Sequence, residues 1–200
     1  MDQARVYLGV DPGKNGGAAL LDAGGGIIEV WRWREGKDPL SSYNILLKYA
    51  GYKSIYSYIE HIRLFPALPP AVLLNTQALL VNVGQWLAVL DLLGIPYLQI
   101  TPADWQARYG LRHWRKRQAK LDALANQAQI PALTNPLALA RHLWPDAPLR
   151  TQADDGVAVA LLLADLARRD HLLATTAPRH DDQQPLPLPS KGGTTPPRRA

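Results

Sequence analysis

The chain has 200 residues, of which 47% are hydrophobic, which is enough for one compact core and does not require a second domain. It contains no cysteine, which excludes disulfides, zinc ribbons and thiol nucleophiles and leaves oxygen or imidazole ligands for any metal. The formal net charge of +5 favours a polyanionic partner.

Short β-type runs and turn residues occupy the first part of the sequence. The run that ends at Asp11 is followed by Pro-Gly and Gly-Gly pairs, which are typical of a turn. Three glycines at 24–26 indicate a hairpin between two further strands, so the chain is expected to begin with an antiparallel arrangement. The predicted strands cover residues 6–10, 18–21 and 27–33.

Helical and β-type segments alternate through the rest of the chain. Apolar residues at helical spacing fill 76–93, and Gly94 stands where a helix C-cap is expected. The last segment is apolar nearly all round from Val157 to Ala164, so its helix should be buried against the sheet. The predicted elements are helices over 40–49, 76–93, 116–129 and 151–169 and strands over 55–62 and 95–100.

The end of the chain is rich in proline and has little that could pack. We therefore expect one domain over residues 1–173 and a disordered tail over 174–200. Apolar stretches such as 156–164 fall well below the roughly 18 residues that a membrane span needs. The first residues also lack the apolar core of a signal peptide, so the sequence predicts a cytoplasmic protein without a membrane partner.

A basic segment without acids lies between Trp105 and Leu121. Its Lys and Arg residues are interleaved with aromatic side chains, which suits a surface that meets phosphates together with sugar or base faces. The alternative is an ordinary solvated helix face. Together with Lys14 in the first turn, the candidate DNA contacts are Arg112, His113, Arg115, Lys116, Arg117 and Lys120.

Three acids stand where distant parts of the chain can meet. Asp11 ends the first strand, Glu60 lies on a middle strand, and Asp155 lies in the polar first turn of the last helix. Two divalent ions held by such carboxylates can activate water and stabilise the leaving oxygen in phosphodiester hydrolysis. Magnesium prefers oxygen ligands, so the pattern predicts Mg²⁺, with Mn²⁺ able to substitute.

Each acid also has a simpler interpretation. Asp11 followed by Pro-Gly is a good turn by itself, and Glu60 alone would be an exposed strand residue. Asp154 and Asp155 together are typical of a helix N-cap. Their joint occurrence in this order favours the metal-binding hypothesis.

The order of these motifs resembles RuvC-type Holliday junction resolvases. The stretch 9–17, Gly-Val-Asp-Pro-Gly-Lys-Asn-Gly-Gly, is similar to the opening of that family, in which the aspartate is the first metal ligand. Glu60 resembles the family's second acid. Similarity to phage-type and plant organellar members spans about residues 6–169 and includes Gly84, Leu93-Gly94-Ile95-Pro96, Thr101-Pro102, Trp105, Leu143-Trp144-Pro145, 155–158 and 160–164.

This resemblance implies an α/β protein with an RNase H-like fold: a mixed five-stranded sheet with three antiparallel N-terminal strands, flanked by helices. It implies a crossover junction endodeoxyribonuclease that cuts branched DNA such as four-way junctions, at the nucleoid or in a phage-infected cell. Symmetric incision of two strands implies a homodimer, with the helix over 76–93 as candidate interface. The implied catalytic residues are Asp11, Glu60, Asp154, Asp155 and Lys116, and the four acids among them are the implied metal ligands.

The closing motif departs from the resemblance at one position. Such resolvases usually carry another acid one helical turn after the first, and here that position is Val159. Asp154 could replace it, but consecutive helical residues point about 100° apart, so this would require an unwound first turn. The departure keeps open a module that binds junctions without cutting them.

Other proteins with a similar opening motif provide further alternatives. One is an RNase H-like nuclease that acts on another nucleic acid. A transposase would need an additional domain, and an actin-like ATPase or sugar kinase would need two lobes, for which 200 residues leave no room.

Overall fold

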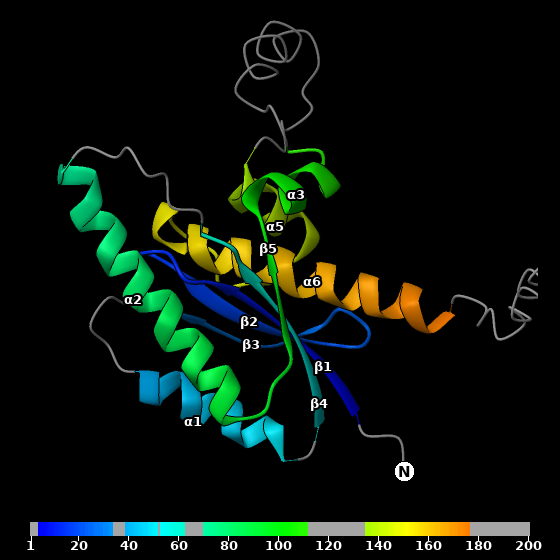
Figure 1. The fold of residues 1–200 in the computed structure, drawn as a ribbon. Helices are drawn as coiled ribbons and strands as arrows, with labels where there is room; N and C mark the ends of the chain where they lie inside the picture. Colours follow the sequence, from blue (N-terminus) through cyan, green and yellow to red (C-terminus); the bar gives the residue numbers. More distant parts are fainter. Residues whose placement is uncertain (1–3, 34–38, 52, 63–69, 112–134, 177–200) are drawn as a thin grey trace, which may run out of the picture.

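The computed structural model contains a five-stranded mixed sheet with helices on both faces (Figure 1). The described residues are 4–33, 39–51, 53–62, 70–111 and 135–176. The strands are β1 (Ala4–Asp11), β2 (Gly17–Asp22), β3 (Ile27–Arg32), β4 (Lys53–Glu60) and β5 (Tyr97–Ile100). The helices are α1 (Pro39–Ala50), α2 (Pro70–Leu92), α3 (Pro102–Arg108), α5 (Pro136–Leu143) and α6 (Asp155–Thr176), with a 3-10 turn η1 (Gln152–Asp154) before α6.

The strand order is β3-β2-β1-β4-β5. The first three strands along the chain pair antiparallel, whereas β4 pairs parallel with β1 and β5 pairs parallel with β4. The predicted mixed sheet with three antiparallel N-terminal strands is therefore confirmed.

Alternation in β1 separates the two faces of the sheet. Val6, Leu8 and Val10 are fully buried in the core that the sheet forms with α1 and α2. Because successive side chains of a strand point to opposite faces, Gly9 and Asp11 belong to the other face, which α6 covers. The core under α1 and α2 also contains Leu20, Leu46, Ile55, Ile59, Trp86, Val89 and Leu90.

Helix α6 is buried along its first half, as the sequence predicts. Every residue from Val157 to Ala164 is at most 8% exposed. One side of the helix packs on β1 and β2, and another packs on Ile100 of β5 and Trp105 of α3. No helix in the described part of the chain is long and apolar enough to cross a membrane.

Glycine at position 9 lets α6 lie directly on β1. A Cβ atom there would be 2.5 Å from the Ala164 backbone nitrogen and closer still to the Ala160 carbonyl oxygen, and neither backbone group can turn aside. A second close approach lies at Gly17, where a Cβ would be 2.8 Å from the Val157 side chain. These two contacts fix the depth of α6 on the sheet.

The helix predicted over 76–93 is longer than expected. Helix α2 begins earlier, at Pro70. Proline is compatible with this start, because the first turn of a helix does not need its backbone N–H. Its predicted end is confirmed, since Gly94 follows with a φ of 62°. The next strand, predicted over 95–100, begins at Tyr97.

The last helix is also longer than predicted. It starts at Asp155, after η1, and continues to Thr176, so the first residues assigned to the tail are helical. The remainder of the tail, 177–200, lies outside the described residues, as does the helix predicted over 116–129.

Helices α3 and α5 are not among the elements predicted from the sequence. With 7 and 8 residues they are too short for hydrophobic periodicity to reveal them. Local signals are present, however: Thr101 and Asn135 accept hydrogen bonds from backbone N–H groups in the first turn, and proline follows each of them. These cap and proline pairs are the pattern that could have identified both helices.

Candidate active site

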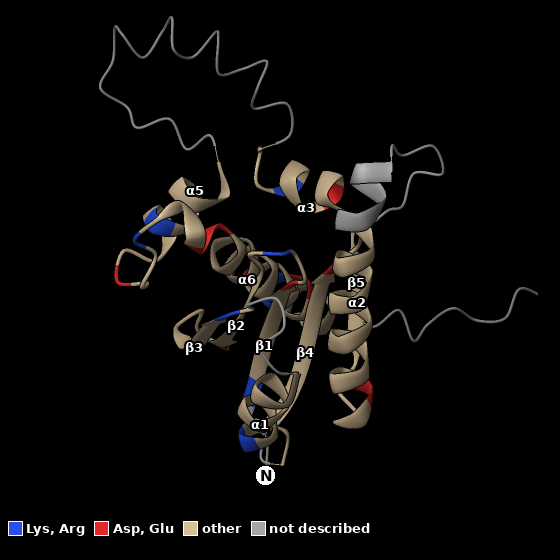
Figure 2. Cartoon of the chain, turned by 90° about the vertical axis from the view of Figure 1, so that its left-hand side faces the viewer, with Lys and Arg blue, Asp and Glu red and all other residues tan. Residues whose placement is uncertain are grey.

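Asp11 and Glu60 end two neighbouring parallel strands. Val10 of β1 pairs with Ile59 of β4, so the next residue of each strand reaches the same edge of the sheet. Both acids belong to the face that α6 covers, because Val10 and Ile59 are buried on the opposite face. Figure 2 shows acidic positions in red at these strand ends beside α6. The structure thus brings the first two candidate residues together.

Asp155 joins them from the start of α6. An isolated bridge links Gly16 to Gly156, which places the first turn of the helix against the turn after β1. A Cβ at Gly156 would collide with the Asn15 carbonyl oxygen, so glycine permits this approach. The side chain of Asp155 is exposed, and its charge acts on Asp11.

Burial raises the pKa values of these carboxyls, and repulsion between them adds to this effect at Asp11. The pKa of Asp11 is raised to about 7, mainly by burial and then by the charges of Glu60 and Asp155. A 2.8 Å hydrogen bond from the Gly13 N–H to Asp11 Oδ1 opposes this effect. Burial also raises the pKa of Glu60, and partial desolvation by neighbouring groups raises that of the more exposed Asp155. The cluster is unfavourable when fully ionised, and either a proton or a cation would relieve it.

The cluster has only oxygen donors, which are the ligands that hard divalent ions such as Mg²⁺ prefer. Asp11, Glu60 and Asp155 are the residues that could hold such an ion. Within the described ranges, no three Asp, Glu or His side chains already stand at the spacing of a formed metal site.

The raised pKa of Asp11 predicts an unusual pH dependence of stability without divalent ions. Folding moves this pKa from 3.8 to about 7, so the folded state holds a proton that the unfolded chain releases. The free energy of unfolding should therefore fall as pH rises from about 4 to about 7. Asp11→Asn should raise the free energy of unfolding at pH 8 by roughly 1–4 kcal/mol and change it little at pH 4. Urea denaturation in EDTA measures this difference.

Asp91→Asn is the matched control, because Asp91 is exposed on α2. It should leave the pH profile of stability unchanged. An equal gain for Asp11→Asn at pH 4 and pH 8 would contradict a raised pKa of Asp11.

Glu60 is held by an indole from α3. The Nε1–H of Trp105 donates to Glu60 Oε1 at 2.9 Å, and Trp105 is only 1% exposed. Burial raises the pKa of Glu60, and this hydrogen bond acts in the opposite direction. The sequence identifies Trp105 only as part of a motif and as an aromatic neighbour of basic residues, so it gives no sign of this contact.

Asp154 turns its carboxylate to other partners. Its Oδ1 accepts from the Arg32 guanidinium, and its Oδ2 accepts at 2.8 Å from the backbone N–H groups of Arg150 and Thr151. Burial alone would raise the pKa of Asp154, but the N–H groups and Arg32 hold it below its ordinary value. Because Asp154 is 1% exposed and is the N3 residue of a capping box whose N-cap is Thr151, the geometry favours a helix-capping role over metal ligation.

The position where the resemblance leads one to expect a further acid is part of the core. Val159 is 8% exposed and belongs to the hydrophobic cluster that contains Trp105 and Leu163. A carboxylate there would be buried and costly unless an ion compensated its charge. The carboxylate cluster at this edge of the sheet therefore consists of Asp11, Glu60 and Asp155.

Of the candidate DNA contacts, Lys14 is the one that the structure describes. It is exposed in the turn after Asp11. In the described first part of the basic segment, the hydroxyl of Tyr109 donates to Asp165 Oδ2 at 2.9 Å, and Leu111 is buried in the cluster around α6. The other candidates lie outside the described residues: Arg112, His113, Arg115, Lys116, Arg117 and Lys120.

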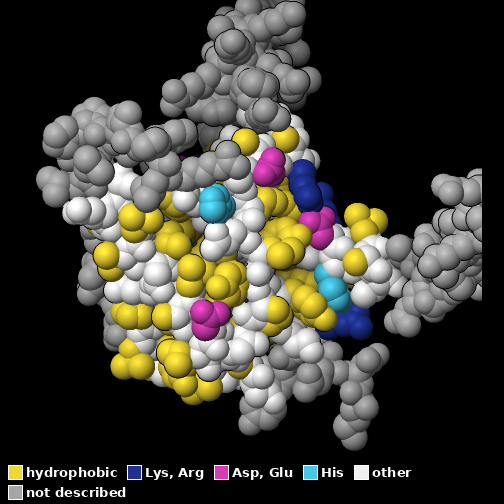
Figure 3. Space-filling model, in the orientation of Figure 1, with side chains coloured by type: hydrophobic (Ala, Val, Ile, Leu, Met, Phe, Trp, Pro, Cys, Tyr) yellow, Lys and Arg dark blue, Asp and Glu magenta, His cyan; other side chains and the backbone are white. Residues whose placement is uncertain are grey.

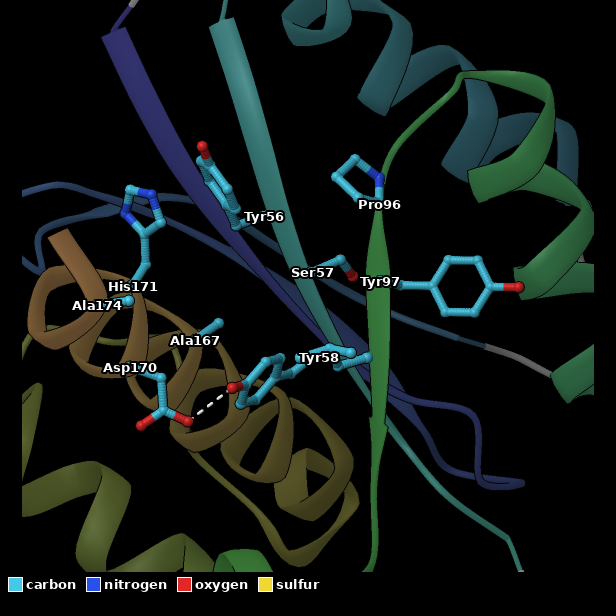
Figure 4. Close-up of a pocket in the computed structure, with 10 residues that line it drawn as sticks. Tyr56, Ser57, Tyr58, Pro96, Tyr97, Ala167, Asp170, His171 and Ala174 are labelled. Carbon is cyan, nitrogen blue, oxygen red and sulfur yellow. Dashed lines mark hydrogen bonds between the residues drawn. The ribbon is translucent and has the colours of Figure 1, made fainter. Parts of the chain in front are cut away.

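An apolar hollow of about 440 Å³ lies between β4, β5 and the second half of α6 (Figure 4). Figure 4 shows the Tyr58 hydroxyl directed at Asp170, to which it donates at 2.6 Å. On the other side, His171 lies against Tyr56, with ring centroids 3.9 Å apart. None of the three clustered carboxylates lines this hollow, so it is separate from the candidate active site.

Comparison with known proteins supports the fold. No protein-family model matches the sequence, and no curated protein matches it. A structure of T. thermophilus RuvC in complex with a Holliday junction substrate aligns over 86% of this chain and 96% of its own, with 10% identity and a TM-score of 0.55. A Thermus thermophilus RuvC structure aligns over 82% and 96%, with 16% identity and a TM-score of 0.43. The first of these likenesses shows that the chain has the RNase H-like fold of RuvC.

Proposed function

We propose that this protein is a magnesium-dependent endonuclease that cuts branched DNA, with four-way junctions as its substrate. The observation that carries the proposal is the meeting of Asp11, Glu60 and Asp155 at one edge of an RNase H-like sheet. The RuvC structure that shares this fold contains a Holliday junction substrate, which supports the substrate class.

In this proposal Asp11, Glu60 and Asp155 hold Mg²⁺, and Mn²⁺ can take its place. Such ions activate water and stabilise the leaving oxygen in phosphodiester hydrolysis. The carboxylates fit this role because their repulsion, which raises the pKa of Asp11, is relieved by a divalent cation. The Gly13 N–H fixes one oxygen of Asp11, and Trp105 fixes one oxygen of Glu60, so each side chain retains an oxygen for the ion.

The hydrogen bond from Trp105 predicts an effect on metal affinity. Trp105→Phe removes the N–H that orients Glu60, and loss of such a supporting contact should weaken Mg²⁺ or Mn²⁺ binding by about tenfold. Calorimetric titration of Mn²⁺ into the purified protein measures the affinity directly, without reference to cleavage.

Trp86→Phe provides the matched control for the change in volume. Trp86 is fully buried on the opposite face of the sheet, and its indole N–H has no hydrogen-bond partner among the described residues. It should lower stability in the same way as Trp105→Phe and leave the metal affinity unchanged. Equal affinities for the two variants would show that Trp105 acts only by packing.

DNA binding is proposed to use Lys14 and the basic segment around Lys116. Lys14 is exposed in the turn after Asp11, and the first part of the basic segment is anchored on α6 through Tyr109 and Leu111. Phosphate contacts release counterions, so each contact should contribute about one unit to the salt slope of binding. Lys116 also remains the candidate basic group near the cleaved phosphate.

A homodimer through α2 is proposed because two opposed strands of a junction must be cut. Leu80 and Val81 are 40% and 58% exposed on α2, and Gly84 is exposed one turn further along. Figure 3 shows hydrophobic side chains gathered over α1 and α2. A twofold interface there would cover this apolar surface and give two active sites related by symmetry.

Cleavage of a synthetic four-way junction with and without Mg²⁺, beside linear duplex and single strand, tests the proposal. We expect paired incisions of the junction that require the ion and little cleavage of the linear DNA. Binding of the junction without incision would instead identify a junction-binding module. Preferential cleavage of a linear substrate would indicate an RNase H-like nuclease for another nucleic acid.

A further inference from the structure

Arg32 ends β3 at the same edge of the sheet as the carboxylate cluster. Asp11 pairs with Gly17, and Gly17 pairs with Arg32, so the three residues lie side by side across three strands. Adjacent strands are about 4.8 Å apart, which places the Arg32 backbone roughly 10 Å from that of Asp11. The start of α6 lies over Gly17, between the two.

The Arg32 side chain is fixed by Asp154 and remains accessible. Its Nε donates to Asp154 Oδ1 at 2.7 Å, and its Nη2 donates to the same oxygen. Both bonds use one edge of a guanidinium that has five N–H donors. The Arg32 side chain is 39% exposed, whereas that of Asp154 is 2% exposed. A buried acid therefore holds an arginine that still has donors for an external anion.

We propose that Arg32 binds a phosphate of the DNA strand near the one that is cleaved, and that Asp154 is the positioning residue for it. This inference rests on the proposed function. Guanidinium groups match phosphate oxygens in charge and geometry, and prior fixation of the side chain lowers the entropy lost on binding. Arg32 thus fixes the path of the strand across the start of α6.

Replacing both members of the Arg32–Asp154 ion pair shows whether Arg32 contacts a phosphate or only stabilises the fold. Arg32→Gln alone leaves the buried charge of Asp154 without its arginine partner, which lowers the free energy of unfolding. Arg32→Gln combined with Asp154→Asn removes that charge and keeps the net charge of the protein unchanged. A change in the salt dependence of binding by the double variant therefore reports a lost local contact and not a change in overall charge.

We expect the double variant to bind the junction in EDTA with a salt slope smaller by about 1 and with roughly five- to tenfold lower affinity at 0.1 M salt. Arg32→Lys keeps a positive charge and should retain most of the slope. Lys48→Gln is the control, because Lys48 is exposed on α1, which covers the opposite face of the sheet. It should leave the slope nearly unchanged.

A measurement on the unmodified protein covers the case in which the variants fail to fold. Phenylglyoxal modifies accessible arginines, and peptide mass spectrometry gives the rate at Arg32. Junction DNA should slow this modification at least severalfold, while free mononucleotide at the same phosphate concentration should not.

Three outcomes are distinguishable. A smaller slope together with protection of Arg32 supports the contact. An unchanged slope, or an unprotected Arg32, in a protein that binds and cuts junctions would overturn the inference and leave Arg32 as a structural partner of Asp154. Absence of any DNA binding by the unmodified protein would overturn the proposed function and the inference together.

Discussion

Asp11→Asn, Glu60→Gln and Asp155→Asn should each lower the rate of junction cleavage by roughly three orders of magnitude while binding of the junction in EDTA survives. Each change removes one charged oxygen that is proposed to bind the ion, and it alters the shape of the side chain little. The acids end β1, end β4 or begin α6, so none of them is needed to fill the core. Single-turnover cleavage at saturating Mg²⁺ gives the rate.

Thermal unfolding with and without Mg²⁺ provides a second measurement on the same proteins. An ion that binds only the folded state stabilises it, so Mg²⁺ should raise the melting temperature of the unmodified protein and have a much smaller effect on each variant. Asp146→Asn, in the exposed turn after α5, should retain both cleavage and the Mg²⁺ effect. Near-normal turnover of any one of the three variants would remove that residue from the metal site.

Gly9→Ala should lower the free energy of unfolding by more than about 3 kcal/mol or prevent folding altogether. The added methyl group would lie 2.5 Å from the Ala164 nitrogen and closer to the Ala160 carbonyl oxygen, both of which belong to the backbone of α6. The helix would have to move away from β1, and its contacts with β2 would be lost at the same time. Urea denaturation followed by circular dichroism measures the loss.

Gly51→Ala is the control for the general effect of replacing glycine. A Cβ at position 51 would meet no atom of the described residues within 4 Å, and Gly51 is not among the described glycines with positive φ. We expect a change of less than about 1 kcal/mol. A stable Gly9→Ala protein would mean that α6 can pack at a greater distance from the sheet than the structure shows.

The β-type runs and the apolar last helix made much of this fold predictable from the sequence. The run that ends at Asp11 predicts β1, whose residues 6–10 are buried, and the run from Val157 to Ala164 predicts a helix that is covered on nearly all sides. Because strand ends meet at a sheet edge, the positions of Asp11 and Glu60 in sequence already suggested their meeting in space.

Contacts between residues far apart in the sequence were not predictable in the same way. Trp105 reaches Glu60, and Arg32 reaches Asp154, only after the sheet and α6 have assembled, and no local pattern encodes either pair. Asp154 illustrates the difficulty, because an aspartate before a helix suits a cap and a metal ligand equally well. The partner that favours the cap, Arg32, is supplied by a distant strand.

In the proposed enzyme, burial and repulsion within the carboxylate cluster set up a trade-off between activity and resistance to heat. Burial and the neighbouring charges that raise the pKa of Asp11 make the ion-free fold less stable than the same fold with a neutral residue at this position. Selection of variants that remain folded after heating in a chelating buffer would therefore enrich neutral residues at Asp11 or Glu60. The most stable proteins recovered would be inactive. Selection with Mg²⁺ present would favour the acidic residues instead, because an ion bound to the folded state would make the protein with the acidic cluster the more stable one.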